Sequence, residues 1–375
     1  MRPLRIATAM AAVAVLLSAA SADAAAGLSI VSSPNPAGSD FNELDGVAAT
    51  GAANAWAVGF TRTAGALAFQ PLAERWNGTS WQIAATAAVT ASDNRLHALA
   101  LNGANDGWAV GESSVFTSTG AVTSSLIEHW NGAAWSKAAS PAGEPAGTRL
   151  LAASSTSASD VWAVGATTST QPVIEHWNGT AWSVVAGAVS AGGGARLLGV
   201  KALASNNVWA VGSTGARHPD PFIEHWNGTA WAEVAQPVSG FDSALLSVSA
   251  TGPNDVWAVG TQNLNQTVTE HWDGTAWTLV PSPTITANNA QDTLTGVVAL
   301  STGDAWAVGQ TLSNFTTTTT LALHWDGTSW QIVASANAGT GSNFFTAVTG
   351  TAPGQPLWAV GQNGSFNTLI ETTTG

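Results

Sequence analysis

Short apolar runs separated by turn residues follow one another along almost the whole chain. Four kinds of run recur in a fixed order, typified by "LLGVKALA" (Leu197–Ala204), "VWAVG" (Val208–Gly212), "IEHW" (Ile223–Trp226) and "TAWSVV" (Thr180–Val185). Their lengths and their content of Val, Ile and Trp predict β-strands, and helical periodicity is absent beyond the N-terminal segment. An Asn-Gly or Asp-Gly pair separates the third run from the fourth, which predicts a two-residue hairpin turn. Each set therefore predicts four antiparallel strands.

Tryptophan marks each copy of this set. The tetrapeptide "WAVG" recurs in steps of 47 to 54 residues and begins at Trp56, Trp108, Trp162, Trp209, Trp257, Trp306 and Trp358. All 19 tryptophans belong either to this motif or to the "HWNGTAW"-like element that follows six of its copies. Four-stranded units of this length predict the blades of a β-propeller. The expected fold is thus all-β, with seven four-stranded antiparallel blades.

The two ends of the chain complement each other. The seventh unit stops soon after "LIE" (Leu369–Glu371) and has no fourth strand, whereas "LSIVSSPNP" (Leu28–Pro36) resembles a fourth strand such as "WTLVPSPTI" (Trp277–Ile285). The N-terminal strand is therefore predicted to complete the last blade. That pairing would close the ring and leave few free strand edges. We expect one propeller domain over residues 28–375.

These motifs resemble those of known propellers. The repeats are similar to those of secreted bacterial propellers grouped with Kelch and galactose-oxidase central domains, and the "VWAVG…W" rhythm is similar to that of tectonin-type lectin propellers. The resemblance implies a propeller fold from about Leu28 to Gly375 and a binding role, carbohydrate binding included. Because tyrosine and cysteine are both absent, the Tyr–Cys radical cofactor of galactose oxidases cannot form. We expect neither a cofactor nor a bound metal.

The first residues have the features of a secretory signal peptide. Arg2 and Arg5 precede an apolar run that is too short for a comfortable membrane span, and "SADA" (Ser21–Ala24) offers a small-residue cleavage site. The prediction is a signal peptide over residues 1–24, with cleavage after Ala24 or Ala26. The remaining chain would be secreted, without a membrane span, and we expect it to be a monomer.

The charge balance excludes some partners. The net charge is −13, only 9% of residues are charged, and the only lysines are Lys137 and Lys201. An acidic, lysine-poor surface argues against binding nucleic acid or an anionic membrane. Because cysteine is absent, the core alone must hold the exported chain together.

Histidines recur on the third strand, and their spacing argues against a metal centre. Each lies in a different blade, where the blades have already fanned apart, so they cannot converge on one ion at ligand distances of about 2 Å. We expect scaffold partners for them, a glutamate or a backbone carbonyl. The five are His129, His176, His225, His271 and His324.

Arginine recurs at one position of the innermost strand. Arg95, Arg149 and Arg196 each precede the first leucine of that strand, in three consecutive blades. Innermost strands begin at the face that carries the variable loops, so we expect the three guanidiniums along one side of the channel mouth. Arginine binds carboxylate or sulfate through paired donors. This predicts an anion site, for example for an acidic sugar, with Arg217 and His218 as outer contacts. The alternative is that each arginine pairs with a nearby carboxylate or carbonyl.

These observations favour a secreted, non-catalytic binding module with a glycan or protein ligand on the loop-bearing face. Carbohydrate is the preferred ligand, an acidic glycan or another anionic ligand at the arginine site, and no catalytic residue is assigned. Two alternatives stay open: a cell-surface platform for protein docking, and an extracellular glycan-active hydrolase or lyase. The enzyme would use two of the loop carboxylates as an acid–base pair, and the candidates are Glu112, Glu144, Asp220, Asp242 and Asp292.

Overall fold

The computed structural model describes residues 27–87, 89, 93–188, 194–215, 219–238, 242–263, 265–285 and 289–373. The predicted signal peptide, residues 1–24, lies outside these residues. The strands are β1 (Leu28–Ile30), β2 (Ser39–Gly51), β3 (Asn54–Thr63), β4 (Gln70–Trp76), β5 (Trp81–Ala84), β6 (Asp93–Gly103), β7 (Asp106–Thr117), β8 (Gly120–Trp130), β9 (Trp135–Lys137), β10 (Thr148–Ser157), β11 (Asp160–Thr167), β12 (Pro172–Trp177), β13 (Trp182–Val184), β14 (Ala195–Ala204), β15 (Asn207–Thr214), β16 (Asp220–Trp226), β17 (Trp231–Glu233), β18 (Ala244–Gly252), β19 (Asp255–Gln262), β20 (Gln266–Trp272), β21 (Trp277–Leu279), β22 (Gln291–Ser301), β23 (Asp304–Ser313), β24 (Thr317–Trp325), β25 (Trp330–Val333), β26 (Phe344–Thr349), β27 (Trp358–Gln362) and β28 (Thr368–Thr373).

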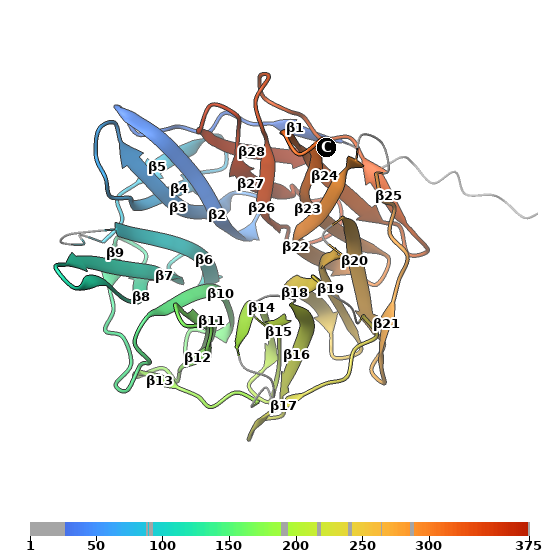
Figure 1. Cartoon of the computed structure of the whole chain (residues 1–375), viewed down its shortest axis with the longest axis horizontal. Coiled ribbons are helices and arrows are strands. Elements are labelled where there is room, and N and C mark those ends of the chain that lie inside the picture. Colours follow the sequence, from blue (N-terminus) through green and yellow to red (C-terminus); the bar gives the residue numbers. More distant parts are fainter. Residues whose placement is uncertain are drawn as a thin grey trace, which may run out of the picture.

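Seven four-stranded antiparallel sheets, the blades, are formed by these described residues and stand in a ring (Figure 1). Residues of all seven innermost strands line two cavities, which we call the central channel. Blades 1 to 6 follow chain order as β2–β5, β6–β9, β10–β13, β14–β17, β18–β21 and β22–β25. Blade 7 consists of β26, β27, β28 and, as its outermost strand, β1. The predicted all-β, seven-bladed fold is confirmed.

The N-terminal strand closes the ring as predicted. β1 pairs antiparallel with β28, with Leu28 opposite Thr373 and Ile30 opposite Glu371. Leu28 packs in one buried cluster with Trp306 of blade 6. At other blade junctions, a tryptophan of the fourth strand occupies the position that Leu28 occupies here. The outermost strand of blade 7 is thus contributed by the opposite end of the chain.

The core lies between the blades rather than within them. At the junction of blades 3 and 4, Trp162 and Val164 of β11 pack against Leu197 of β14 and Trp231 of β17. The rings of Trp162 and Trp231 meet edge to face at 5.5 Å. A buried tryptophan removes roughly 150–250 Å² from water, a gross stabilisation of about 4–6 kcal/mol. The repeated tryptophans are therefore scaffold.

Third-strand histidines belong to the scaffold as well. His176 Nε2 lies 2.7 Å from Asp160 Oδ1, an acid in the first hairpin turn of the same blade, and its ring stacks on Trp162 at 4.2 Å. His129, His271 and His324 pair with the equivalent aspartates, and His225 pairs with Asn207. The partner is thus the turn residue and not the glutamate or backbone carbonyl that the sequence suggested.

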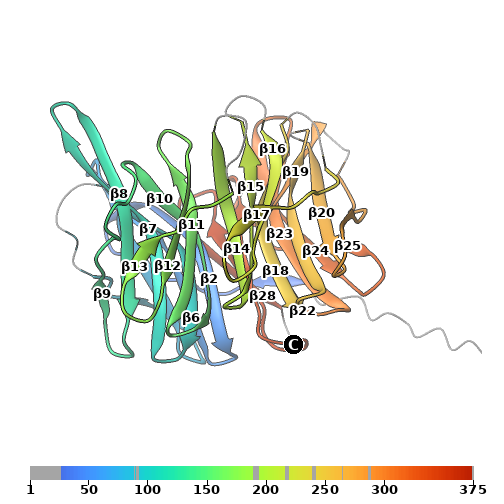
Figure 2. The same cartoon turned by 90° about the horizontal axis from the view of Figure 1, so that it is seen from below.

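Hairpins between the second and third strands, together with the connections between blades, occupy one end of the molecule, the loop-bearing face. Figure 2 shows these hairpins at one end of the blades, with the β7–β8 hairpin extending furthest. The other end carries only the turns between first and second and between third and fourth strands. Within the described part of the chain, no helix combines the length and the apolar character that a bilayer span requires.

Candidate functional site: the channel mouth

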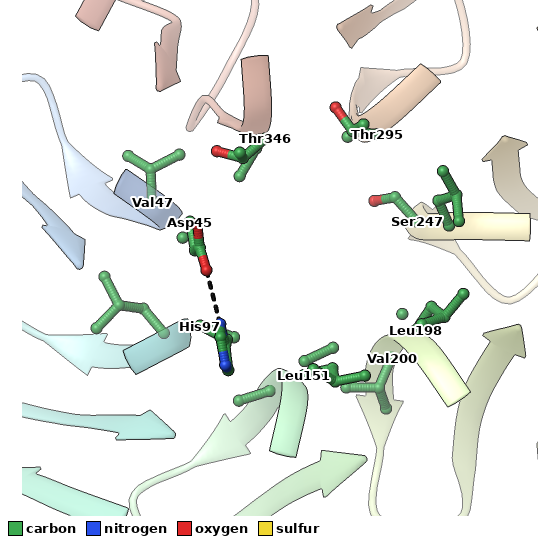
Figure 3. Close-up of a pocket in the computed structure, with 18 of the residues that line it drawn as sticks. Asp45, Val47, His97, Leu151, Leu198, Val200, Ser247, Thr295 and Thr346 are labelled. Atoms are coloured by element: carbon green, nitrogen blue, oxygen red, sulfur yellow. Dashed lines mark hydrogen bonds and ion pairs between the residues drawn. The ribbon is translucent and has the colours of Figure 1, made fainter. Parts of the chain in front are cut away.

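A β-bulge in every innermost strand places one side chain at the mouth of the channel. In β6 the pairing with β7 steps from Leu96 to Ala98, so His97 is the extra residue, and β2 skips Asp45 in the same way. A bulge aims its extra side chain out of the regular sheet. The residues at this position in blades 1 to 7 are Asp45, His97, Leu151, Leu198, Leu246, Thr295 and Thr346. They border a cavity of 160 Å³ at the loop-bearing end of the channel (Figure 3).

Charged residues are confined to one side of this mouth. His97 Nδ1 lies 2.6 Å from Asp45 Oδ2, and its Nε2 lies 3.9 Å from Glu112 Oε1. Glu112 Oε2 lies in turn 2.6 Å from Arg149 Nε, an ion pair without hydrogen-bond geometry. A chain of alternating charges thus runs from blade 1 through blade 2 to blade 3. We call these four residues the mouth network.

The environment fixes the charge state of the mouth network. Burial lowers the pKa of His97, but the hydrogen bond to Asp45 and the nearby Glu112 outweigh it and raise this pKa to about 9. Burial raises the pKa of Glu112, while His97 and Arg149 lower it, and the net result lies below its usual value. His97 is therefore an imidazolium at neutral pH, held between two carboxylates. Such a histidine is poorly suited to act as a general base at that pH.

Blade 7 extends this network through one amide. Gln362 Nε2 donates to the Asn42 carbonyl at 2.9 Å and lies 3.3 Å from Glu43 Oε2. Burial and the adjacent Asp45 carboxylate together raise the pKa of Glu43 to about 8. Glu43 therefore stays largely protonated at neutral pH, and it adds little negative charge to the mouth.

The arginines expected at the mouth have different surroundings. Arg95 forms two hydrogen bonds with Asp93, at 2.9 and 3.0 Å, and its guanidinium lies 4.4 Å from the centre of the Phe69 ring. Arg149 belongs to the mouth network, and its side chain is 48% exposed. Arg196 is exposed and forms no ion pair with the described residues. Arg217 and His218 lie outside the described residues, and a ligand role for all five stays a prediction.

The sequence analysis predicted that the residue before the first leucine of the innermost strand lies at the channel mouth. In the structure, the residue after that leucine borders the cavity. None of the described arginines is among the residues that line this cavity. Strict alternation of side chains misses a bulge, because the extra residue shifts the pattern by one. The sequence held one usable signal: Asp45 and His97 stand where five other blades carry leucine or threonine.

Large apolar side chains are exposed on the same face, at hairpins between second and third strands. The exposed fraction is 94% for Leu67, 62% for Phe116, 67% for Phe315 and 54% for Phe366. They lie in blades 1, 2, 6 and 7, which are consecutive around the ring. Four exposed large apolar side chains on neighbouring hairpins make this part of the loop-bearing face a candidate binding surface.

Two of these phenylalanines adopt a backbone conformation that suits glycine. Asn314 and Phe315 have φ of 49° and 59°, and Phe366 has φ of 58°. Residues 313–316 form a turn closed by the Thr316 N–H donating to the Ser313 carbonyl. Asn-Gly is the usual sequence when both central residues have positive φ. The Phe366 ring stacks on Phe41 at 5.5 Å, so it has a partner within the fold. Phe315 has no ring contact with the described residues, which points to a ligand-facing role for Phe315.

Two of the other loop carboxylates, Asp292 and Glu144, have backbone or hydroxyl partners. Asp292 is buried and accepts hydrogen bonds from the Ile285 N–H and from Thr311. Glu144 accepts one from the Ser125 N–H at 2.7 Å. Among the described residues, no group of three His, Asp or Glu side chains is placed to hold a metal ion.

Fold and channel mouth together define a seven-bladed β-propeller with a charged, partly apolar loop-bearing face. No protein-family model and no curated protein matches the chain. Similar solved structures include "YCF48 bound to D1 peptide", with 15% identity, a TM-score of 0.56, and coverage of 92% of this chain and 98% of that one. YCF48 from Cyanidioschyzon merolae is 13% identical, with a TM-score of 0.57 and coverage of 93% and 99%.

A third similar structure is the extracellular domain of the putative hybrid two component system BT4673 from B. thetaiotaomicron. It is 10% identical, with a TM-score of 0.55, and the match covers 92% of this chain and 39% of that one. At these identities the likeness concerns the propeller fold. Membership of the Kelch or tectonin groups, secretion and carbohydrate binding stay predictions.

Proposed function

We propose that this protein is a secreted, non-catalytic binding module that holds a peptide segment of another protein on its loop-bearing face. The exposed Phe315, in left-handed backbone conformation and without a ring contact among the described residues, carries this proposal. Phe315 and Phe366 expose large apolar surfaces at a conformational cost of about 1–2 kcal/mol each. Burial of such side chains against a partner offsets this cost, since each apolar ring contributes roughly 2 kcal/mol or more when it leaves water.

The mouth network provides the polar part of the proposed site. A peptide lying across blades 6, 7, 1 and 2 would contact the apolar tips and pass over Asp45 and His97. Interfaces commonly combine aromatic anchors with a polar rim that fixes the register of the ligand. A similar propeller, YCF48, has been solved with a D1 peptide, which supports a peptide as the class of ligand.

An acidic glycan is the second candidate ligand, and a specific placement favours it. Arg149 and Arg196 occupy equivalent positions in adjacent blades 3 and 4, and both side chains are accessible. Guanidinium groups bind carboxylate or sulfate through paired hydrogen bonds. An anionic sugar would therefore bind over blades 3 and 4, away from the apolar tips.

Binding measurements on residues 27–375 separate the two candidates. Peptides selected from a random library should bind the parent protein and lose at least about tenfold in affinity in Phe116→Ser and Phe366→Ser. Ile83→Ser is the matched control, because Ile83 is 45% exposed but lies on the outermost strand β5. Equal losses in all three variants would contradict the peptide site.

An array of uronate-containing, sialylated and sulfated glycans tests the second candidate. Saturable binding that is lost in Arg149→Ala and Arg196→Ala, and kept in Phe116→Ser, would identify the glycan as the ligand. If neither class binds the folded protein, the assignment of the loop-bearing face as the binding surface is wrong.

A further inference from the structure

At the end of the channel away from the loop-bearing face, a single lysine faces a cavity without an acidic neighbour. This cavity has a volume of 390 Å³, and Lys201 of β14 is the only charged residue among the described residues that line it. Lys201 forms no ion pair with any described residue. A cation so placed has lost part of its hydration without gaining a counter-charge.

Two serines stand beside it at equivalent positions of the neighbouring blades. Ser154 in blade 3, Lys201 in blade 4 and Ser249 in blade 5 each lie opposite the tryptophan of the "WAVG" strand in the register of their own blade. All three line the cavity. The seven-fold arrangement therefore places a lysine between two serines on one wall of the channel.

Both hydroxyl oxygens already accept a hydrogen bond from the next blade. The Ala202 N–H donates to Ser154 Oγ at 3.0 Å, and the Ala299 N–H donates to Ser249 Oγ at 3.0 Å. Since each hydroxyl is held as an acceptor from the backbone, its own proton is directed to another partner. No acceptor for either proton is found among the described residues. This wall therefore carries the hydrogen-bond donors of Lys201, Ser154 and Ser249, and no carboxylate is found among the described residues that line the cavity.

We propose that Lys201, Ser154 and Ser249 bind a small oxyanion or carboxylate inside the channel, of the size of phosphate, sulfate or acetate. Charge-assisted hydrogen bonds to such an anion are stronger than neutral ones. The rest of the accessible wall is mostly polar, which suits a small anion that keeps part of its hydration.

The ionisation of the lysine is consistent with this site. Burial lowers the pKa of Lys201 below its usual value, because desolvation disfavours the ammonium form. An anion bound beside it reverses that effect. The alternative is a lysine that is merely hydrated by water in the channel, and this alternative predicts no preference for one anion over another.

Calorimetric titration of residues 27–375 with sodium phosphate, sulfate and acetate, in a chloride background at pH 7, tests the site. At least one of the three should bind saturably at one site, and the most tightly bound anion defines the ligand class. Lys201→Met should weaken that binding at least about tenfold. Lys137→Met is the matched control, because Lys137 is the only other lysine and lies on the outermost strand β9.

A second measurement on the unaltered protein guards against a variant that fails to fold. With lysine labelled at Cε, carbon NMR should give two lysine signals, and the anion should shift only the signal of Lys201. The proposal is overturned if none of the three anions binds, if Lys201→Met binds as well as Lys137→Met, or if both lysine signals respond equally.

Discussion

The glycine of each "WAVG" motif is fixed by close contact with the neighbouring strand. A Cβ on Gly212 would lie 1.8 Å from the Arg196 carbonyl oxygen, and the other six copies have the same contact at 1.9 to 2.0 Å. The contact occurs where the innermost strand bulges, so this glycine also makes room for the residue that reaches the channel mouth. One small residue thus links the repeat to the site.

Gly212→Ala should therefore destabilise the fold by more than the roughly 1–3 kcal/mol of ordinary overpacking, because a backbone carbonyl must move. Gly252→Ala is the control, since a Cβ there would meet nothing within 4 Å, and its effect should stay within about 1 kcal/mol. Thermal and urea unfolding of both variants measure the difference. Similar stabilities would show that the close contact is relieved cheaply.

The conformation of Phe315 predicts opposite effects on stability and on binding. Glycine removes the steric cost of positive φ, about 1–2 kcal/mol, but loses about 0.5–1 kcal/mol in chain entropy. Phe315→Gly should therefore leave the melting temperature unchanged or slightly raised, while weakening the binding of selected peptides. Calorimetry and peptide titration on the same sample check both parts. A clear loss of stability would mean that the aromatic ring serves the fold instead.

At the scale of the strand, the repeat made the architecture predictable. Seven "WAVG" strands, their hairpin turns and the strand shared between the two chain ends all follow from periodic apolar runs. The contact between Asp45 and His97 could not be predicted from these runs, because it depends on a bulge that moves one residue out of the alternating pattern. Pairing of Glu112 with Arg149 joins two blades, and contacts between units are not encoded by the spacing within a unit.

Strand β1 is the element on which closure depends. Besides its pairing with β28, the segment that follows it is tied to blades 1 and 7: Ser33 Oγ donates to Glu74 at 3.0 Å, and the Thr368 N–H donates to Asn35 Oδ1 at 3.0 Å. Deletion of residues 28–36 should lower the melting temperature and promote self-association, because β28 becomes an unpaired edge.

Calorimetry measures the melting temperature of this deletion protein, and light scattering measures its self-association. The reference is a protein that lacks only residues 1–26. A deletion protein that keeps its melting temperature and stays monomeric would contradict closure by β1.

Across the whole molecule, buried glutamates on the third strand of a blade lie beside the segment that links the preceding blade to it. Glu128 accepts a hydrogen bond from the Ala87 N–H at 2.9 Å, and Glu224 and Glu371 accept equivalent bonds from the Ala188 and Ala336 N–H groups. Six blades carry a buried glutamate at this position of the register, whereas blade 6 carries Leu323. Burial raises the pKa of all six, to about 7 or 8, and they are Glu74, Glu128, Glu175, Glu224, Glu270 and Glu371.

This arrangement predicts a protein that is more stable in mild acid than in mild alkali. A folded-state pKa above the unfolded value of 4.5 means that the native state binds more protons between pH 4.5 and about 8. The stabilisation is fully present below pH 4.5 and is lost as the pH rises through 7 to 8. His97, with its pKa raised to about 9, changes stability in the same direction at higher pH. The melting temperature should therefore fall steadily from pH 5 to pH 8.

Replacement of one glutamate tests whether these groups cause the fall. Among the described residues, neither carboxylate oxygen of Glu175 has a hydrogen-bond partner, and burial raises the pKa of Glu175 to about 8. Glu175→Leu, which copies Leu323 of blade 6, should stabilise the protein at pH 8 by about 1 kcal/mol or more and change it less at pH 5. Asp220→Asn, at an exposed carboxylate, should leave the slope of melting temperature against pH unchanged. If Glu175→Leu also leaves that slope unchanged, the pH dependence arises elsewhere, because a group that no longer titrates cannot contribute to it.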